Sequence, residues 1–174
     1  MTAAKLTLIL GGANSGKSAY AEALVLQAAQ RPAYIATAQA FDDEMRAKIA
    51  RHQVARGPEW TTFEAPLDPA GALGKVGLAD AVLIDCATLW LSNLLIAEAV
   101  DGDHEERLFA AIEDCPAPVV IVSNEVGAGL VPETAMGRRF RSLQGGFNQR
   151  AAAQADRVIA VMAGLPLALK GDLP

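Results

Sequence analysis

The 174-residue sequence predicts an α/β domain in which helices cover both faces of a mostly parallel sheet. Short apolar runs that are typical of strands alternate with longer stretches that are typical of helices, which is the order that builds a parallel sheet. Apolar residues make up 52% of the chain and charged residues 20%, and this balance suits strands buried on both faces. The length, without an internal repeat or linker, predicts a single domain over residues 1–174.

Strands are expected where short apolar runs are bounded by turn-forming or polar residues. Residues 6–10 read Leu-Thr-Leu-Ile-Leu, and residues 118–124 form the clearest central strand. Residues 60–64 alternate between polar and apolar positions, and residues 165–170 are expected to return as a short edge strand. In chain order, the expected strands are residues 6–10, 32–36, 60–64, 81–86, 118–124, 157–162 and 165–170.

Helices are expected in the longer stretches between these strands. Residues 41–56 place His52 on the same face as Met45 and Ile49, and a Gly-Pro pair ends that helix. Residues 89–100 are strongly apolar, which fits either a core helix or an interface with another chain. In chain order, the expected helices are residues 20–27, 41–56, 70–76, 89–100, 105–114 and 137–154, with a polar loop at 101–104.

A phosphate-binding motif follows the first expected strand. Backbone N–H groups of such a loop converge on phosphate oxygens, and the helix N-terminus adds the positive end of its dipole. Lys17 is expected to reach the β- and γ-phosphates, and the Ser18 hydroxyl to hold Mg²⁺. A glycine turn with a chance lysine would not need a strand before it and a helix after it, so we predict a P-loop protein that binds a nucleoside triphosphate. The residues that match G-x-x-x-x-G-K-[ST] are Gly11, Gly12, Ala13, Asn14, Ser15, Gly16, Lys17 and Ser18.

Asp85 lies near the end of the apolar run 81–86. A P-loop enzyme needs a further acid that helps to hold Mg²⁺ through its oxygens, and Asp85 stands where that acid is expected. The other interpretation is an ordinary aspartate at a strand end. We favour the metal role because the P-loop requires such a partner.

Two histidines are candidates for chemistry. His52 shares a helix face with apolar residues, which favours a core or half-buried histidine. Its neighbours are rich in acids and arginines, however, and a neutral imidazole close to a triphosphate is a competent nucleophile. His104 lies in the acidic loop and is expected to be solvated.

Polar residues after the central strand form two further candidates. Residues 124–129 (Asn-Glu-Val-Gly-Ala-Gly) either face the ligand crevice, as residues after such strands do, or form a flexible turn. The later helix carries a basic and amide-rich set that either meets a phosphorylated substrate or is solvated. That set is Arg138, Arg139, Arg141, Asn148, Gln149 and Arg150.

Bulk properties narrow the function class. The net charge of −5 argues against nucleic-acid binding. Cys86 and Cys115 show no metal-ligand or CxxC spacing, which favours a reduced, cytoplasmic setting. No apolar run reaches 18 residues and the N-terminus lacks a signal-peptide pattern, so no membrane insertion is expected.

Taken together, these blocks resemble the bifunctional adenosylcobinamide kinase / adenosylcobinamide-phosphate guanylyltransferase family of cobalamin biosynthesis. The resemblance extends from Leu8 to about Met162. The spacing from Asp-Glu-Met to His52, joined to Asn-Glu-Val-Gly, is far more specific than a P-loop alone. The other blocks that carry it are residues 34–39 (Tyr-Ile-Ala-Thr-Ala-Gln), Trp60, Glu64, Thr88, Asn93-Leu94-Leu95, Val131-Pro132-Glu133, Asn148-Gln149 and Ala155-Asp156.

The resemblance implies site residues and a mechanism. The histidine that matches His52 attacks the α-phosphate of GTP, expels pyrophosphate and carries GMP covalently. The chain departs from the family pattern at three positions. Asn14 replaces an arginine that is common in the loop, which bears on how the triphosphate is bound. Asp85 stands where some relatives have glutamate, and Arg51 where some have a second histidine. Beyond the P-loop, the implied nucleotide-binding residues are Thr37, Ala38, Gln39, Gln53, Val54, Ala55, Arg56, Glu64 and Asp85.

The implied enzyme first phosphorylates the aminopropanol hydroxyl of adenosylcobinamide with ATP or GTP, with Mg²⁺ as the cofactor. It then passes GMP from His52 to the cobinamide phosphate, giving adenosylcobinamide-GDP. The resemblance also implies a homo-oligomer, with a trimer expected. Alternatives are a small-molecule P-loop kinase without guanylyl transfer, a family member with one activity, and a nucleotide-dependent switch. The switch is disfavoured because the sequence has no Asn-Lys-x-Asp tetrad.

Overall fold

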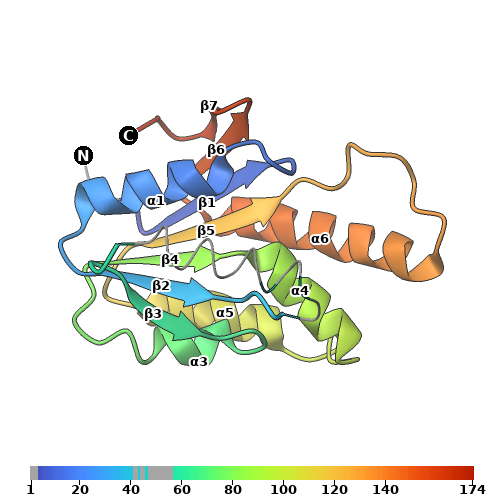
Figure 1. Ribbon diagram of the computed structural model, residues 1–174, viewed down its shortest axis with the longest axis horizontal. Coiled ribbons are helices and arrows are strands. Elements are labelled where there is room, and N and C mark those ends of the chain that lie inside the picture. The colour runs from blue at the N-terminus through green and yellow to red at the C-terminus, as the bar shows by residue number, and fades with distance from the viewer. Residues whose placement is uncertain (1–3, 41–42, 44–45, 47–56) are drawn as a thin grey trace.

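The computed structural model describes residues 4–40, 43, 46 and 57–174. Its strands form one sheet and its helices pack on both sides of that sheet (Figure 1). The strands are β1 (Leu6–Gly11), β2 (Pro32–Ala36), β3 (Thr61–Glu64), β4 (Ala81–Asp85), β5 (Val119–Asn124), β6 (Arg157–Met162) and β7 (Leu165–Lys170). The helices are α1 (Lys17–Ala28), α3 (Pro69–Leu73), α4 (Ala87–Ile96), α5 (His104–Asp114) and α6 (Ala135–Gln154).

The sheet has the strand order β3-β2-β4-β5-β1-β6-β7. Every neighbouring pair is parallel except β6 and β7, which form an antiparallel hairpin. Strand β5 is flanked by β1 and β4, and its first five residues are buried. The expected α/β fold with a mostly parallel sheet is therefore confirmed, including the edge strand at the C-terminal end.

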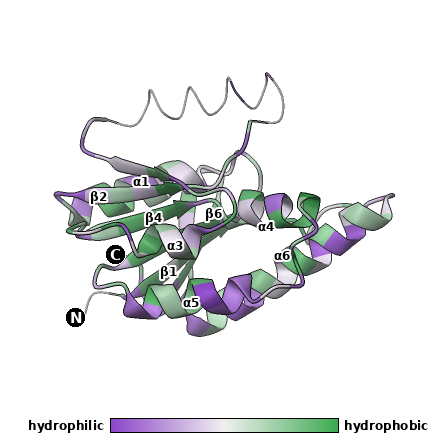
Figure 2. Ribbon diagram, turned by 90° about the horizontal axis from the view of Figure 1, so that it is seen from below, coloured by the Kyte–Doolittle hydropathy of each residue, from purple (hydrophilic) through white to green (hydrophobic). Residues whose placement is uncertain are grey.

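The two faces of the sheet are covered unequally. Helix α1 packs on one face with Ala21 and Val25, against Ile9, Leu83 and Ile159. Helices α3, α4, α5 and α6 pack on the other face, as the view from below shows (Figure 2). This larger layer contains the aromatic centre of the core.

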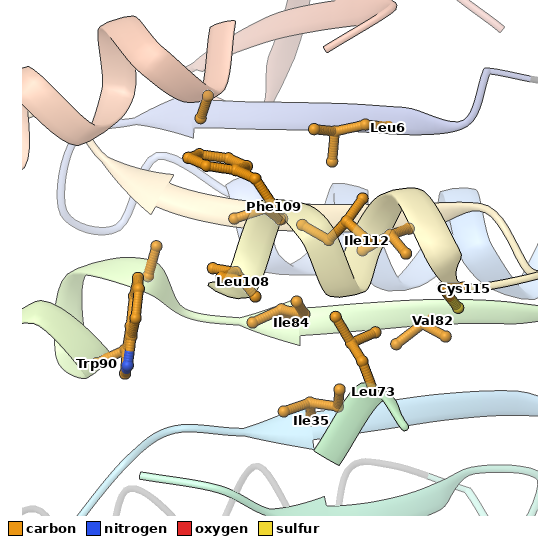
Figure 3. Close-up of a cluster of buried hydrophobic side chains, with 14 of the residues drawn as sticks. Leu6, Ile35, Leu73, Val82, Ile84, Trp90, Leu108, Phe109, Ile112 and Cys115 are labelled. Carbon is orange, nitrogen blue, oxygen red and sulfur yellow. The ribbon is translucent and has the colours of Figure 1, made fainter. Parts of the chain in front are cut away.

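The centre of that layer is built on Phe147 of α6. Its ring stacks on Phe109, with ring centroids 5.9 Å apart, and meets Trp90 edge-on at 5.8 Å. Figure 3 shows Trp90, Leu108, Phe109 and Ile112 among the buried side chains of this cluster. Trp90, Leu91 and Leu94 are all 1–2% exposed, so the apolar character of α4 is explained by the core of this chain.

Element boundaries differ from the expectation at helix starts. The helix expected to begin at residue 20 begins at Lys17, so α1 includes the last two residues of the P-loop. The helix expected to begin at residue 89 begins at Ala87, with Cys86 as the N-cap of α4. Helix α6 begins at Ala135 because the Thr134 hydroxyl accepts from the Gly137 N–H, 3.1 Å away, which is an ordinary N-cap.

Two further expectations concern His104 and the helix at residues 41–56. The prediction of a solvated loop position for His104 is wrong, because His104 is the first residue of α5 and is partly buried. The helix expected at 41–56 falls almost entirely outside the described residues. Within the part of the chain that the structure describes, no helix is long and apolar enough to cross a membrane.

Candidate active site

The predicted site residues of four strands meet at the carboxyl edge of the sheet. Because β2, β4, β5 and β1 are parallel neighbours, the segments that follow them leave the sheet side by side. In register, Ala36 lies opposite Asp85, and Gly11 lies opposite Asn124. The fold therefore brings the P-loop, Asp85 and the start of residues 124–129 to one edge.

The P-loop is held by a contact between residues near its two ends. Gly16, the N-cap of α1, has a φ of 92°, a left-handed conformation that glycine adopts without strain. Lys17 is 9% exposed, and its Nζ donates to the carbonyl of Gly12, 3.1 Å away. The cation thus spans the loop from its last turn to its first, at the place where phosphate oxygens are expected.

The turn of the β6–β7 hairpin packs against the P-loop and donates a hydrogen bond to it. This two-residue turn, Ala163-Gly164, has positive φ at both positions, and the Gly164 N–H donates to the Ser15 carbonyl over 2.8 Å. A Cβ on Gly16 would lie 3.2 Å from the Gly164 Cα, and one on Gly11 would lie 2.6 Å from the Val161 carbonyl oxygen. Sequence reasoning missed this support, although a two-residue gap between two expected strands is the length of a tight hairpin turn.

Asp85 lies at the end of β4, half-buried, with each carboxylate oxygen facing a hydroxyl. The Ser18 hydroxyl is 3.5 Å from Oδ1, at the limit of a hydrogen bond, and the Tyr34 hydroxyl donates to Oδ2 over 2.6 Å. A serine hydroxyl and a carboxylate are oxygen ligands of the kind that Mg²⁺ takes in addition to phosphate oxygens and water. The structure thus gives the predicted pair, Ser18 and Asp85, a geometry that fits Mg²⁺.

The Thr37 hydroxyl is buried and makes its hydrogen bonds within the protein. Its hydroxyl donates to the Cys86 carbonyl over 2.7 Å and accepts from the Cys86 N–H at 2.8 Å. The Asn93 amide donates to the Thr37 carbonyl over 2.7 Å, so the segments after β2 and β4 are tied together. Burial, and then the charge of Asp85, raise the pKa of the Cys86 thiol to about 11, so this thiol stays protonated at neutral pH.

The remaining implied nucleotide contacts are placed to different degrees. Ala38 and Gln39 follow Thr37 and are half-buried, and Glu64 ends β3 with an exposed side chain opposite Ala36. His52, Gln53, Val54, Ala55 and Arg56 lie outside the described residues. The carboxyl edge as described is therefore the part built by the P-loop, β2, β3, β4 and β5.

The end of β5 is anchored to α4 and α6. The Asn124 N–H donates to the Thr88 hydroxyl over 2.8 Å, and the Asn148 amide donates to the Asn124 carbonyl over 3.1 Å. The Glu125 N–H donates to the Gly11 carbonyl over 3.1 Å, which joins this turn directly to the P-loop. Residues 124–129 thus begin as part of the site edge rather than as a separate flexible turn.

Polar atoms without partners occur at this edge. Among the described residues, the Ser15 hydroxyl and the Asn124 Oδ1 are buried with no hydrogen-bond partner. Buried polar groups are ordinarily paired. Their position in and beside the P-loop fits a site that is completed by a polar ligand.

The basic and amide-rich set on α6 contains one buried residue, and most of its other members are exposed. Asn148 is buried and accepts from the Ser123 hydroxyl over 2.7 Å. The arginines contact protein groups: Arg138 the carbonyls of Pro132 and Glu133, Arg139 the carboxylate of Asp101, Arg141 the carbonyl of Gly127, and Arg150 the carboxylate of Glu105. Arg138, Arg139, Gln149 and Arg150 are nevertheless exposed, which fits the solvated alternative. Contact of this set with a phosphorylated substrate stays a prediction.

The comparisons with known proteins identify the family of this chain. The family model described as cobinamide kinase / cobinamide phosphate guanyltransferase matches residues 7–169. The chain belongs to this family. The bifunctional adenosylcobalamin biosynthesis protein CobP of Pseudomonas aeruginosa is 43% identical over 169 residues, covering 95% of this chain and 97% of the relative. The corresponding proteins named CobU of Salmonella typhimurium and Escherichia coli are 42% and 39% identical, each covering 95% of this chain and 99% of the relative.

Two solved structures were also found by their shape. The RadB recombinase has a TM-score of 0.48 at 15% identity, covering 89% of this chain and 73% of that one. The KaiC-like protein PH0186 from Pyrococcus horikoshii has a TM-score of 0.48 at 10% identity, covering 89% and 71%.

Family membership confirms the resemblance that the sequence blocks indicated. The chain is an enzyme of the family whose two activities are cobinamide kinase and cobinamide phosphate guanyltransferase. The family match spans the P-loop, Asp85 and the turn between β6 and β7, all of which lie at the carboxyl edge of the sheet.

Proposed function

We propose that this chain phosphorylates adenosylcobinamide with ATP or GTP and then transfers GMP from GTP to the phosphorylated product through His52. The product is adenosylcobinamide-GDP. The observation that carries the kinase part is the placement of Lys17, Ser18 and Asp85 at one sheet edge, with Ser18 Oγ 3.5 Å from Asp85 Oδ1. Family membership supports the guanylyl-transfer part.

In the kinase step, the chain's residues position and neutralise the triphosphate. Lys17 places its ammonium group at the β- and γ-phosphates, and the P-loop N–H groups hold their oxygens. The substrate hydroxyl oxygen bonds to the γ-phosphorus, the bond to the bridging oxygen breaks, and the nucleoside diphosphate leaves with that electron pair. The hydroxyl proton passes to solvent. Ser18 and Asp85 are the residues that would hold Mg²⁺, which supplies positive charge to the phosphate oxygens when bound.

In the transfer step, a neutral His52 nitrogen attacks the α-phosphorus of GTP, and pyrophosphate leaves with the electrons of the broken P–O bond. A phosphate oxygen of the cobinamide phosphate then attacks the same phosphorus and breaks the P–N bond, which frees His52. Two displacements avoid bringing two polyanions together at once. The proposed nucleotide contacts are Gly11 to Ser18, Thr37, Ala38, Gln39, Gln53, Val54, Ala55, Arg56, Glu64 and Asp85.

The setting of the enzyme is part of the same proposal. The substrates are small molecules that the cytoplasm supplies together with Mg²⁺, and no nucleic acid or membrane takes part. A homo-oligomer is expected, with three copies as the expected number. Light scattering of the purified protein measures that number.

Incubation with α-labelled GTP and Mg²⁺ tests the proposal. The wild-type chain is expected to retain label in an acid-labile bond, because a phosphoramidate is the product of the first displacement. The matched control is His104→Ala, which is expected to label like wild type, since His104 is half-buried at the start of α5 away from the P-loop. A wild-type protein that turns over cobinamide but never retains label would leave a kinase without the covalent step.

A further inference from the structure

Tyr34 of β2 touches the acid of the site from inside the core. The residue is 3% exposed, and its hydroxyl donates to Asp85 Oδ2 over 2.6 Å. Strands β2 and β4 are parallel neighbours in which Tyr34 lies opposite Leu83, so the phenol extends along the sheet to reach the end of β4. A hydrogen bond to a charged acceptor at this length belongs to the stronger class.

The ring of Tyr34 is fixed by its surroundings. It meets Trp60 edge-on, with centroids 5.6 Å apart and planes at 87°. Both rings belong to the buried cluster under α1, together with Ile9, Val25 and Leu83. Close packing of this kind holds a side chain in one rotamer, so the hydroxyl arrives at Asp85 from a fixed direction.

The two carboxylate oxygens of Asp85 therefore have different partners. Oδ2 accepts from Tyr34, whereas Oδ1 faces the Ser18 hydroxyl and the P-loop. A carboxylate held by a donor on one oxygen presents the other oxygen in a set orientation. Partners that orient a metal ligand in this way govern the affinity of the site for its ion.

We propose that Tyr34 is a positioning residue for the metal-site acid: it locks the Asp85 carboxylate so that Oδ1 is presented to the magnesium–triphosphate complex beside Ser18. The inference rests on the proposed function, in which Ser18 and Asp85 hold Mg²⁺. It adds that the strength of this site is set by a phenol that touches neither the nucleotide nor the ion. Tyr34 acts through Asp85, so its effect disappears when Asp85 cannot bind the ion.

A purely structural phenol would behave differently. If the hydroxyl only satisfied a buried oxygen, Tyr34→Phe would lower the melting temperature of the ligand-free protein and leave its response to Mg²⁺ unchanged. A positioning phenol changes the Mg²⁺ response at any given stability. The matched control is Tyr20→Phe, because Tyr20 is the only other tyrosine and packs partly against the same cluster.

The experiment is a thermal-shift titration of the full chain with Mg²⁺, at a saturating concentration of the β,γ-methylene analogue of GTP. The readout is the Mg²⁺ concentration at the midpoint of the stabilisation. Wild type and Tyr20→Phe are expected to share one midpoint. Tyr34→Phe is expected to raise it about tenfold, as removal of a partner that orients a metal ligand does. Stabilisation by the analogue without Mg²⁺ is expected to be the same in all three.

Two further variants make the result decisive. Asp85→Asn is expected to raise the midpoint at least as far, and Tyr34→Phe in that background to raise it no further. Tyr34→4-aminophenylalanine restores an N–H donor on a similar ring and is expected to return the midpoint to within about twofold of wild type. This variant also serves if Tyr34→Phe fails to fold.

The outcomes separate the two layers of the proposal. A Tyr34→Phe midpoint equal to that of Tyr20→Phe, with Asp85→Asn shifted, overturns the role of Tyr34 and leaves the metal site standing. Additive shifts in the double variant overturn action through Asp85. An unshifted Asp85→Asn overturns the magnesium assignment itself, and the role of Tyr34 with it.

Discussion

The two ends of strand β4 carry the same residue type with different tasks. Asp80 precedes the strand at the amino edge of the sheet, and Asp85 ends it at the carboxyl edge. Asp80 accepts the backbone N–H groups of Gln30 and Arg31, at 3.2 and 2.9 Å, where the chain enters β2. Asp85 instead faces the side-chain hydroxyls of Ser18 and Tyr34.

A second aspartate at the amino edge accepts backbone N–H groups as Asp80 does. Asp156 accepts the N–H groups of Lys5 and Leu6, at 2.7 and 3.1 Å, where β1 begins. Carboxylates at this edge therefore satisfy strand starts, which is a local structural task. At the carboxyl edge, the carboxylate is left to side-chain hydroxyls and lies beside a lysine and a glycine loop. The neighbours, rather than the aspartate, distinguish a site from a cap.

The largest expected effect is that of Lys17→Ala. Removing the cation that spans the P-loop is expected to lower both the kinase and the guanylyltransferase rate by at least about a hundredfold, as the loss of one charge-stabilising group does. Lys75→Ala, an exposed change beyond α3, is the control and is expected to keep both rates. Steady-state assays of the two reactions measure this, and near-normal rates in Lys17→Ala would remove the P-loop from the mechanism.

The comparison between the two aspartates is tested directly by exchanging each for asparagine. Asp85→Asn keeps the shape but drops the charge, so kinase activity is expected to fall and to recover partly at high Mg²⁺. Asp80→Asn is expected to keep the wild-type Mg²⁺ dependence. Activity measured across a Mg²⁺ series separates them, and identical curves for the two variants would show that the edges do not differ as described.

The hairpin beneath the P-loop offers a smaller effect. Gly164 and Gly171 flank β7 with φ of 78° and 69°, so alanine at either position strains the backbone and is expected to cost roughly 1 kcal/mol or more of stability. Only Gly164 donates to the P-loop. Gly164→Ala is therefore expected to raise the KM for the triphosphate about fivefold, equivalent to about 1 kcal/mol, and Gly171→Ala to leave it unchanged. Equal KM values in the two variants would count against the support.

The smallest effect concerns pH at the amino edge. The Arg31 N–H is the main cause that holds the pKa of Asp80 below its ordinary value of 3.8. The stabilisation by ionised Asp80 is thus present above pH 3.8 and is lost as the pH falls through its lower folded-state pKa. Unfolding of wild type and Asp80→Asn, followed between about pH 2 and 6, is expected to show a shallower acid decline in the variant. Parallel curves would exclude this linkage.

Sequence patterns predicted the carboxyl edge to the extent that local motifs describe it. The P-loop spacing identified Lys17 and Ser18, and strand periodicity placed Asp85 at the end of its strand. Tyr34 and Thr88 belong to blocks that carry the family resemblance, but the sequence assigns no role to them or to Gly164, because their roles come from contacts with residues distant in the chain. Tyr34 meets Asp85 across 51 residues and Thr88 meets Asn124 across 36, and no spacing rule reports such pairs.

The amino edge and the α6 surface show the same limit from the other side. Asp80 and Asp85 look alike as acids that flank one strand, and only the structure reveals that Asp80 accepts backbone N–H groups while Asp85 faces side-chain hydroxyls. Helical periodicity predicts a basic and amide-rich face on α6, but it does not report the partners of the arginines. Their ion pairs with Asp101 and Glu105 join segments that periodicity cannot relate.

The central claim is that one chain carries two reactions, a P-loop kinase and a transfer through His52. The most direct measurement is to assay His52→Ala for both, with labelled ATP and cobinamide for the first and α-labelled GTP for the second. The account predicts that phosphorylation largely survives, because the P-loop is unchanged, while protein-bound GMP and guanylyl transfer are lost. A folded His52→Ala protein that still retains GMP, or that loses both reactions together, would contradict it.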